Sequence, residues 1–424
     1  MGVSTGVDMS SEVDFDPFLI SAVRARDTDA MENLLLAGAD PDVHDGRGTP
    51  ALCLAIELYA GTAAHLLAEH GADPEQCGPD GVPPLRKAVD SGSPTLVEAV
   101  LHDESRWRHR EAELLEMRNL AQHWHETGTE AELRRRTGAQ DPVARTRVQD
   151  DEFTVVNELS LGGLTVRDGH AAILTHLEAT LNIQTSFEEL MDRALTRPDQ
   201  QHAVWSTSTM LLANRRDQDT WDAAAALRVH PDPAHRLFGA EVLRLTHLFD
   251  QSNEEPFAGP ALELFVDWSG GETDAAVLTE LLVGLGDHAD PRADAALLPY
   301  DSHPDVRVRR AVASAFDMWS RAFSPVIRET LLDLMTDPDA EVRQRACHTV
   351  ADGKDRDPAL ADGMAELLDD PIRQVRVVAV YGLARHDDER CVEGARRLPP
   401  ASPGAPYEYD LDEVWRYKLR RDDR

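Results

Sequence analysis

The chain has 424 residues, of which 42% are hydrophobic and 5% aromatic, so its core is expected to consist mainly of aliphatic side chains. Its 77 acidic and 43 basic residues leave a formal net charge of -34. This sign repels phosphate backbones and anionic lipid surfaces, so it argues against nucleic acid and membrane partners. It favours a protein or peptide partner with a basic face.

The cysteine and lysine content points to the compartment and the source. The four cysteines lie far apart, without a CxxC pair or metal-type spacing, and predict free thiols rather than disulfides or a metal site. Lysine occurs only at Lys87, Lys354 and Lys418, and the scarcity of lysine beside arginine is typical of a GC-rich bacterial genome. No apolar segment follows Met1 and no run reaches the length of a membrane span, so we expect a cytoplasmic protein. No cofactor is expected.

Residues 1–13 are polar and are predicted to be disordered. A period of 33 residues then begins, marked by Ala22, Ala55 and Ala88 and by a proline five residues before each of them. A Gly-Ala-Asp-Pro sequence recurs at the same interval. A period of this length indicates helical units that bury their faces only against their neighbours.

Each feature of this period has a mechanical role. The Thr49-Pro50 pair starts a helix, Gly38 and Gly71 supply left-handed C-caps, and Asp-Gly pairs turn a projecting finger. Over residues 14–103 these motifs resemble ankyrin repeats, although the histidine that the family usually carries after Thr-Pro-Leu is absent. Ala121 continues the period, but the residues around it do not support a fourth unit.

Residues 104–186 break the period and are predicted to connect two arrays of repeats. Residues 104–126 have the apolar spacing of one amphipathic helix. The arginine triplet at 134–136 is either a contact for an acidic partner or a solvated helix end.

β-Branched runs at 153–156 and 164–166, separated by Gly162 and Gly163, predict an irregular hairpin in the same segment. In a chain of repeats, an insertion of this kind is where a specialised function is expected.

Two pairs of side chains in this segment are candidates for chemistry. His123 and His125 lie two apart on a predicted helix and point away from each other, so no metal site is predicted there. Asp168 and His170 form either a catalytic acid–base pair or a simple helix start in which Asp168 is the N-cap.

The C-terminal half is organised around three near-copies of one sequence motif, called the repeated phrase here. The copies begin at Val308, Val342 and Val375, and each follows a proline with acidic neighbours. They predict a second stack of helix pairs over residues 187–398. Ser324-Pro325 and Asp357-Pro358 are expected to start outer helices of this stack. The predicted buried face of the first of these helices consists of Val326, Ile327, Leu331, Leu334 and Met335.

The Asp-Pro-Asp-x-x-Val-Arg sequence of this stack resembles HEAT-like repeats of the short kind, as in phycobilin-lyase-like and armadillo-related solenoids. The resemblance implies that Arg309, Arg343 and Arg376 bond aspartates in a ladder between units. Related enzymes carry paired His-Glu metal ligands; here only His125-Glu126 has that order and it lies outside the stack, so a di-iron enzyme is not expected.

The same phrase predicts which side chains meet a partner. Positions 0, 4 and 8 after the first valine are expected in the core, and positions 2 and 6 on a different face. The predicted contact residues are Glu241, Arg310, Ser314, Gln344, His348, Val377 and Tyr381.

Residues 399–424 begin with a proline-rich break and continue with an aromatic segment that either caps the last repeat or docks elsewhere. The sequence therefore predicts an all-α double solenoid with one small hairpin. Its leading function is a scaffold or adaptor that holds a protein or peptide on concave repeat surfaces. The alternative is a repeat-based tailoring or peptide-modifying enzyme that uses Asp168 and His170, or His348 and Tyr381, and whether any catalysis occurs stays open.

Overall fold

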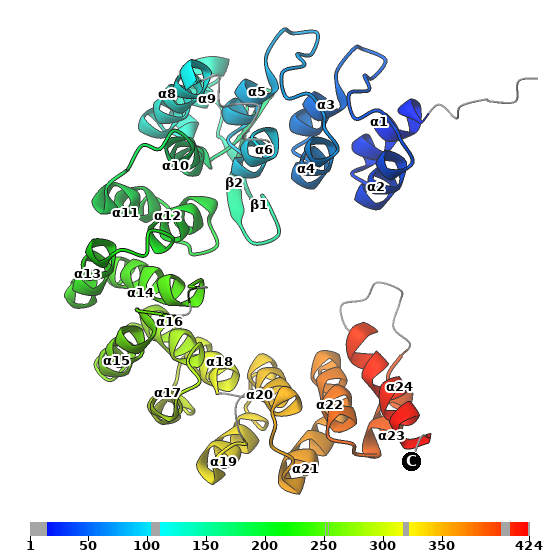
Figure 1. Ribbon diagram of the computed structural model, residues 1–424, viewed down its shortest axis with the longest axis vertical. Coiled ribbons are helices and arrows are strands. Elements are labelled where there is room, and N and C mark those ends of the chain that lie inside the picture. The colour runs from blue at the N-terminus through cyan, green and yellow to red at the C-terminus, as the bar shows by residue number, and fades with distance from the viewer. Residues whose placement is uncertain are drawn as a thin grey trace, which may run out of the picture. The chain divides into compact units, whose positions relative to one another are not determined.

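The computed structural model describes residues 15–102, 111–250, 252, 254–316, 322–399 and 408–422, and these fold into two compact units (Figure 1). One unit covers Met1–Leu211 and the other Leu212–Arg424. Stacked helices dominate both, which confirms the predicted α-solenoid class, and the described residues contain one small sheet. The predicted disorder of residues 1–13 and most of the proline-rich break lie outside the described residues.

The N-terminal unit begins with three helix pairs, each packed against the next. Ala22, Ala55 and Ala88 are buried in the first helix of each pair, where a small side chain lets neighbouring helices approach closely. Gly38 and Gly71 follow the second helices with φ of 97° and 90°, so the predicted left-handed C-caps are confirmed. The pairs are α1 (Asp16–Ala25) with α2 (Thr28–Leu36), α3 (Ala51–Glu57) with α4 (Gly61–Glu69), and α5 (Pro84–Ser91) with α6 (Pro94–Val100).

A fourth helix pair continues this stack, although its two helices are far apart in the sequence. α8 (Glu111–Thr127) packs on α5 and buries Ala121 at the next position of the 33-residue period. α10 (His170–Thr180) packs on α8 and α6, and both helices share one hydrophobic core with the preceding pairs. The period alone does not predict this unit, because residues 128–169 are inserted between its two helices.

The insertion holds α9 (Thr129–Thr137) and an antiparallel sheet in the order β1-β2-β3. β2 (Val155–Leu161) and β3 (Leu164–Arg167) form the predicted hairpin, and Gly162 and Gly163 turn it with φ of 58° and 82°. β1 (Ala144–Gln149) was not predicted as a strand, because its side chains are mostly polar and exposed and give no alternating pattern.

A buried polar cluster around Asp150 fastens the sheet to the third helix pair. Ser93 Oγ and Thr95 Oγ1 donate hydrogen bonds to the Asp150 carboxylate over 2.6 and 2.8 Å. The Arg167 guanidinium donates to the same carboxylate over 2.8 Å and stacks on the ring of Tyr59 at 4.4 Å. The sheet is therefore held against the repeats by hydrogen bonds from Ser93 and Thr95 and by the contact of Arg167 with Tyr59, as well as by apolar packing.

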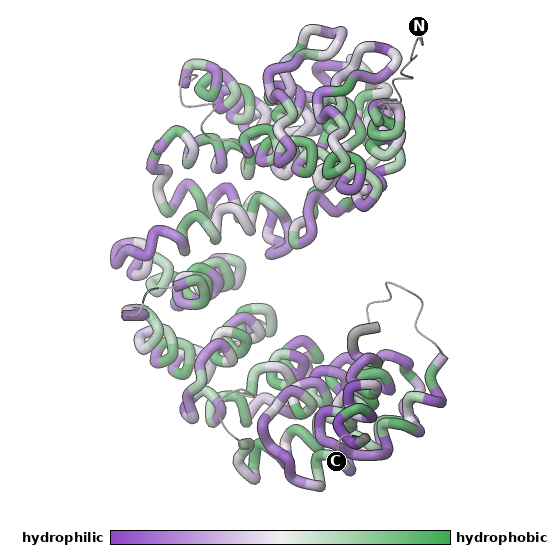
Figure 2. Tube along the Cα trace, turned by 45° about the vertical axis from the view of Figure 1, so that its right-hand side comes forward, coloured by the Kyte–Doolittle hydropathy of each residue, from purple (hydrophilic) through white to green (hydrophobic). Residues whose placement is uncertain are grey.

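The C-terminal unit consists of helix pairs arranged in two rows (Figure 1). Even-numbered helices from α14 to α24 pack side by side, and odd-numbered helices form the other row. Figure 2 shows apolar and polar residues alternating along these helices, as expected for elements with one buried face. From the end of the first unit onward, the helices are α11 (Phe187–Leu195), α12 (Ala203–Ala213), α13 (Gln218–Ala226), α14 (Pro233–Leu248), α15 (Ala258–Ser269), α16 (Ala275–Gly286), α17 (Pro291–Leu297), α18 (Val306–Ala315), α19 (Pro325–Leu334), α20 (Ala340–Asp352), α21 (Pro358–Glu366), α22 (Arg373–Arg385), α23 (Arg390–Arg397) and α24 (Glu408–Asp422), with short 3-10 helices η1 (Leu227–Val229), η2 (Leu298–Tyr300) and η3 (Leu367–Asp369).

The repeated phrase lies in α18, α20 and α22, where Val308, Val342 and Val375 are fully buried. The residues four and eight positions later are buried as well, so the predicted core positions are confirmed. Ser324 and Asp357 cap α19 and α21 as predicted, each by accepting a backbone N–H.

The predicted buried face of α19 is wrong at one residue. Val326 is 55% exposed, whereas Ile327, Leu331, Leu334 and Met335 are buried. The reason is geometric: Val326 precedes Ile327 by one residue, which turns its side chain about 100° around the helix and away from the core.

Arginines at matching positions tie consecutive helix pairs together. Arg309 Nε donates to Asp337, and Arg343 Nε to Asp370, over 2.7 Å in both cases, and a second nitrogen of each guanidinium bonds the other carboxylate oxygen. Each arginine also donates to two backbone carbonyls in the loop before its own helix. The ladder implied by the HEAT-like resemblance is therefore present at these two positions.

The ladder extends further than the sequence phrase. Arg236 donates to both carboxylate oxygens of Glu272 over 2.9 and 2.8 Å, in a unit that the phrase did not mark. Arg376 keeps the backbone contacts, to the carbonyls of Asp370 and Pro371. One unit beyond Arg376, near residue 403, the sequence has no aspartate or glutamate between Glu393 and Glu408, so the spacing of the ladder provides no carboxylate for Arg376.

The last helix, α24, packs against α22 and α23. Val414 and Tyr417 are buried in this contact, whereas Trp415 and Leu419 stay exposed. The end of the C-terminal array is therefore covered by a helix, as a solenoid requires.

Candidate functional site

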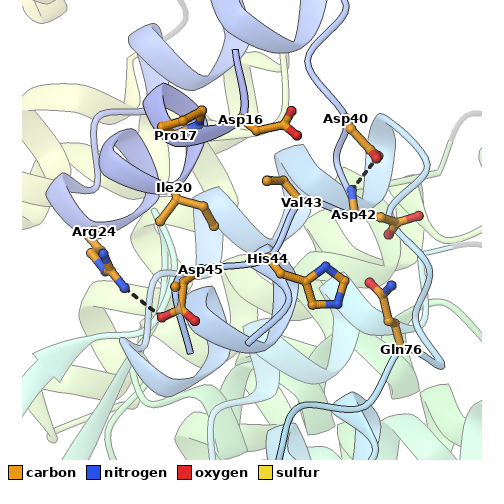
Figure 3. Close-up of a pocket in the computed structure, with 11 residues that line it drawn as sticks. Asp16, Pro17, Ile20, Arg24, Asp40, Asp42, Val43, His44, Asp45 and Gln76 are labelled. Carbon is orange, nitrogen blue, oxygen red and sulfur yellow. Dashed lines mark hydrogen bonds and ion pairs between the residues drawn. The ribbon is translucent and has the colours of Figure 1, made fainter. Parts of the chain in front are cut away.

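A hollow of about 590 Å³, called the finger hollow here, lies beside α1 at the base of the first finger (Figure 3). Its polar lining residues are Asp16, Arg24, Asp40, Asp42, His44, Asp45 and Gln76. Figure 3 shows carboxylates distributed around the opening. Short turns fix the first finger loop: Asp40 accepts the backbone N–H of Asp42, and Asp45 accepts those of Arg47 and Thr49.

The finger hollow is acidic and rich in hydrogen-bond acceptors. Its one guanidinium, from Arg24, is already bound to Asp45 over 2.6 Å. Backbone hydrogen bonds from Thr49 and Arg47, and then the Arg24 charge, hold the pKa of Asp45 below its usual value. Within the described residues, the buried amide oxygen Oε1 of Gln76 accepts no hydrogen bond. A ligand with several N–H donors and a positive charge would complement this lining.

One comparison with known proteins identifies the N-terminal repeats. Residues 19–109 match the family described as ankyrin repeats, in three copies. The three helix pairs within residues 19–109 are ankyrin repeats. No curated protein matches the chain. Among solved structures, the chain is similar to that of the Escherichia coli protein YibA, with 19% identity and a TM-score of 0.41 over 50% of this chain and 75% of that one.

Ankyrin fingers project from the helix stack, and in this chain they carry most of the lining of the hollow. Asp42 Oδ1 also accepts the backbone N–H of Asp73 over 2.6 Å, so the first and second fingers are bonded to each other. The Asp-Gly turns can be predicted from the sequence but the hollow cannot, because its lining comes from α1 and two successive fingers. The excess of aspartate in the repeated finger segments was the available signal.

In the C-terminal unit, the structure brings several predicted contact residues together on α18, α20 and α22. We call this surface the α18–α22 ridge. Arg310 donates to both carboxylate oxygens of Asp339 over 3.0 and 2.9 Å and pairs with Glu341 over 2.7 Å. Arg345, which the sequence analysis did not single out, pairs with Glu341 and donates to Ser314 Oγ. Ion pairs thus join neighbouring helices along the ridge.

His348 and Tyr381 meet at the end of the ridge, with ring centroids 5.9 Å apart. Both face Asp352: the Tyr381 hydroxyl donates to Oδ1 over 2.5 Å, and His348 Nδ1 lies 3.4 Å from Oδ2. Burial and then the bond to Asp352 raise the pKa of Tyr381, and burial raises the pKa of the nearby Asp410 of α24. Tyr381 is therefore a neutral hydrogen-bond donor at physiological pH.

Two predicted contact residues are not on an exposed face. Val377 is 2% exposed, because α22 is enclosed by α20, α21, α23 and α24. Glu241 is 8% exposed, because α14 packs between α13 and α16. Gln344 is half-buried. The rule that placed positions 2 and 6 on one open face is wrong at the positions where an additional helix covers that face.

Asp168 and His170 do not form the acid–base pair that was considered. Asp168 accepts hydrogen bonds from His202 Nε2 over 3.0 Å, from Asn157 N over 2.8 Å and from Arg197 Nε over 2.9 Å. Burial would raise the pKa of Asp168, but these bonds and charges outweigh it and hold the pKa well below its usual range. Asp168 is also not the helix cap, since Gly169 occupies that position without a side-chain bond.

His170 is fully enclosed instead. Its ring stacks on Trp124 with centroids 4.4 Å apart, and burial lowers its pKa to about 3. Trp124 is in turn covered by the Arg136 guanidinium at 4.3 Å. A neutral, buried imidazole cannot reach a substrate in this state, so the enzymatic alternative has no site at Asp168 and His170.

The arginine triplet at 134–136 is structural. Arg135 Nε and Arg136 Nε donate to the fully buried Glu132 carboxylate over 2.6 and 2.8 Å. Arg134 pairs with Glu130 on the surface of α9. Of the two readings of this triplet, a compensated helix end fits these contacts.

Acid is expected to destabilise the N-terminal unit through Glu132. Hydrogen bonds from Arg135, opposed by burial, lower the pKa of Glu132 from 4.5 to about 2. A carboxyl group whose pKa is lower in the folded state stabilises the fold above its unfolded pKa, and this contribution is lost as the pH falls from about 4.5 towards 2. In thermal unfolding across this window, Glu132→Gln should lose less stability than the wild type. The Glu130→Gln variant, whose carboxylate is partly exposed, should follow the wild type, and equal slopes in all three proteins would contradict the assignment.

No group of three or more histidine, cysteine, aspartate and glutamate side chains in the described part of the chain is placed to hold a metal ion. None of the helices in that part is long and apolar enough to cross a membrane.

Proposed function

We propose that the protein is an interaction scaffold that takes a basic segment of a protein partner at its ankyrin fingers. The acidic finger hollow carries this proposal. Four carboxylates, from Asp16, Asp40, Asp42 and Asp45, line it against one arginine that is already paired. Ankyrin repeats generally mediate protein–protein contacts, and the net charge of -34 favours a cationic partner through long-range attraction.

The chemistry of the hollow fits an arginine or lysine side chain. A guanidinium presents five N–H donors, and the lining provides carboxylates and the unpartnered Gln76 oxygen. Charged hydrogen bonds of this kind are about twice as strong as neutral ones. The finger backbones are already fixed by their own turns, so binding would require little additional ordering.

The C-terminal unit supplies a second proposed contact surface, the α18–α22 ridge. We assign this array to the HEAT-like repeats on its paired helices and its arginine–carboxylate ladder, and Arg310, Ser314, His348 and Tyr381 lie along one side of it. Arg310 is held in place by carboxylates of the next helix and Arg345 by a carboxylate of its own helix, and Tyr381 and His348 add aromatic surface. Rigid aromatic and arginine side chains of this kind dominate the energetics of many protein interfaces.

A charge-matched pair of variants tests the finger hollow. The probe is a fluorescein-labelled arginine-rich peptide, titrated with the full chain at physiological salt and followed by fluorescence anisotropy. Asp40→Asn with Asp42→Asn keeps the size of both side chains but removes two charges at the hollow. If each exposed ion pair contributes up to about 1 kcal/mol, affinity should fall by about tenfold.

The control removes the same charge elsewhere in the first repeat. Asp29→Asn with Glu32→Gln changes two exposed carboxylates on α2 that do not line the hollow. This variant should bind within about twofold of the wild type. Equal weakening by both variants would show that the peptide responds only to net charge, and no weakening by either would remove the hollow as a binding site.

A further inference from the structure

The outer edge of β1 is an open strand edge. β1 pairs with β2 alone, and β2 separates it from β3. All of its side chains are exposed except that of Val148, which is half-buried. An edge strand with unpaired backbone groups is a template on which another extended chain can add by hydrogen bonding.

The strand register shows which backbone groups are available. In an antiparallel sheet, hydrogen-bonded and non-hydrogen-bonded residue pairs alternate. The Asp168 N–H donates to the Asn157 carbonyl over 3.0 Å, so odd-numbered residues of β2 bond β3 and even-numbered residues bond β1. It follows from the register that Ala144, Thr146 and Val148 bond β2. The N–H and C=O groups of the alternate residues, Arg145, Arg147 and Gln149, point outward, and none makes a backbone hydrogen bond within the described residues.

The side chains beside this edge indicate the charge of its occupant. Arg145 and Arg147 are two residues apart, so both lie on the same face of the sheet. They pair with Glu130 and Asp199 over 2.9 Å, but each is about half exposed, at 50% and 51%, and has further N–H groups to donate. An added strand with carboxylates at alternate positions would place one opposite each arginine.

A second copy of this chain is a poor occupant of the same edge. A two-fold pairing of β1 with β1 would put arginine opposite arginine, whether it is centred on residue 146 or on residue 147. Like charges directly opposite each other destabilise a strand pair. The two arginines therefore disfavour pairing of β1 with the β1 of a second copy and favour pairing with an acidic strand.

The turn that follows β1 adds an aromatic contact. Phe153 is 78% exposed, yet its turn is well fixed, because the backbone N–H groups of Phe153 and Thr154 both donate to Asp151 Oδ1 over 2.7 and 2.6 Å. The sheet itself is held to the repeats by the Asp150 cluster. An exposed phenylalanine on a turn with a fixed backbone is suited to anchor a peptide bound near this end of β1.

We propose that β1 is a docking strand for an extended peptide segment of a partner that carries acidic side chains at alternate positions. The segment adds to the sheet through the outward backbone groups of Arg145, Arg147 and Gln149. Its carboxylates bind Arg145 and Arg147, and its far end contacts Phe153. This site is distinct in charge and place from the finger hollow, so the two proposals stand or fall separately.

The test uses a fluorescein-labelled peptide that alternates glutamate with threonine and valine, and the same peptide with lysine in place of glutamate. The full chain should bind the glutamate peptide at least about tenfold more tightly than the lysine peptide, since two charge pairs change sign. The Asp40→Asn and Asp42→Asn variant should bind the glutamate peptide as the wild type does. Equal binding of both peptides, or no binding of the glutamate peptide, would overturn the proposal.

Two substitutions at one position separate backbone pairing from charge. Arg147→Thr removes the guanidinium and should weaken the glutamate peptide by about threefold. Arg147→Pro also removes an outward N–H, which is not used within the sheet, and should weaken binding by a further tenfold or so. Circular dichroism and thermal unfolding should be alike for the two variants. Equal binding by Arg147→Thr and Arg147→Pro would overturn strand addition, and so would a concentration-dependent dimer of the wild type that Arg147→Pro abolishes.

Discussion

Adding one methyl group at Gly92 is expected to destabilise the N-terminal unit by about 2–5 kcal/mol. Gly92 ends α5 with φ of 71°, a left-handed conformation that costs other residues about 1–2 kcal/mol. A Cβ at this position would lie only 1.9 Å from the Arg167 carbonyl oxygen of β3 and 2.6 Å from the His170 ring. The backbone of β3 cannot yield without disturbing the Asp150 cluster, so overpacking adds to the conformational cost.

A second glycine provides the matched control for this prediction. Gly71 has φ of 90°, and nothing lies within 4 Å of a Cβ built there. Gly71→Ala should therefore cost only the conformational term, about 1–2 kcal/mol. Thermal unfolding of the full chain, with hydrogen exchange in β3 and α5 to identify the unit that opens, measures both variants. If Gly92→Ala is no worse than Gly71→Ala, the close approach of the third ankyrin pair to β3 is not a constraint on folding.

The repeat architecture could be predicted from the sequence because stacked units must satisfy the same packing problem again and again. Ala22, Ala55 and Ala88 occupy one contact in three pairs, and Val308, Val342 and Val375 another. Local chemistry marked the ends of these elements, as at Ser324 and Asp357, whose side chains accept the first N–H groups of a helix. Periodicity therefore carried the prediction of the helices and of most of the buried positions.

The insertion could not be predicted in the same way because its contacts join residues that no period relates. The sequence suggests His170 as the partner of Asp168 because the two residues are close in the chain. The actual partners, His202 and Arg197, come after α11 in the sequence. β1 is polar and exposed, so hydrophobic alternation could not reveal it. A strand that serves as an open edge lacks the apolar pattern by which strands are usually recognised.

A rule based on position within a helix also could not predict which side chains of the ridge are exposed. The sequence assigned Val377 and His348 to the same open face, but only His348 is exposed, since α22 packs against more helices than α20 does. Arg345 was missed because it lies one residue before a predicted core position, and its pairing with Glu341 depends on the spacing within α20. The helices of the ridge were therefore predicted from the sequence, whereas the exposure of their individual side chains required the structure.

Replacing Arg343 by methionine is expected to destabilise the C-terminal array by about 3–5 kcal/mol. The Arg343 guanidinium neutralises Asp370, whose side chain is only 4% exposed, and it donates to the backbone carbonyls of Asp337 and Pro338. Removing it leaves a buried charge and two carbonyls without this donor. Methionine fills similar space, so the loss reflects the missing charge and hydrogen bonds rather than a cavity.

Two further variants, at position 343 and two residues beyond it, distinguish the contribution of the ladder to stability from that of an ordinary surface ion pair. Arg343→Lys keeps the charge but cannot reproduce the two-pronged bond to Asp370, so it should recover only part of the loss. Arg345→Met, two residues along the same helix, breaks an exposed pair with Glu341 and should cost at most about 0.5 kcal/mol. Urea unfolding, with hydrogen exchange reporting on α20 and α22, distinguishes these outcomes. Equal losses for Arg343→Met and Arg345→Met would mean that the ladder contributes no more than an ordinary surface ion pair. A specific loss at Arg343 would instead show that each helix pair depends on a carboxylate supplied by the next, so that damage to one pair propagates along the array.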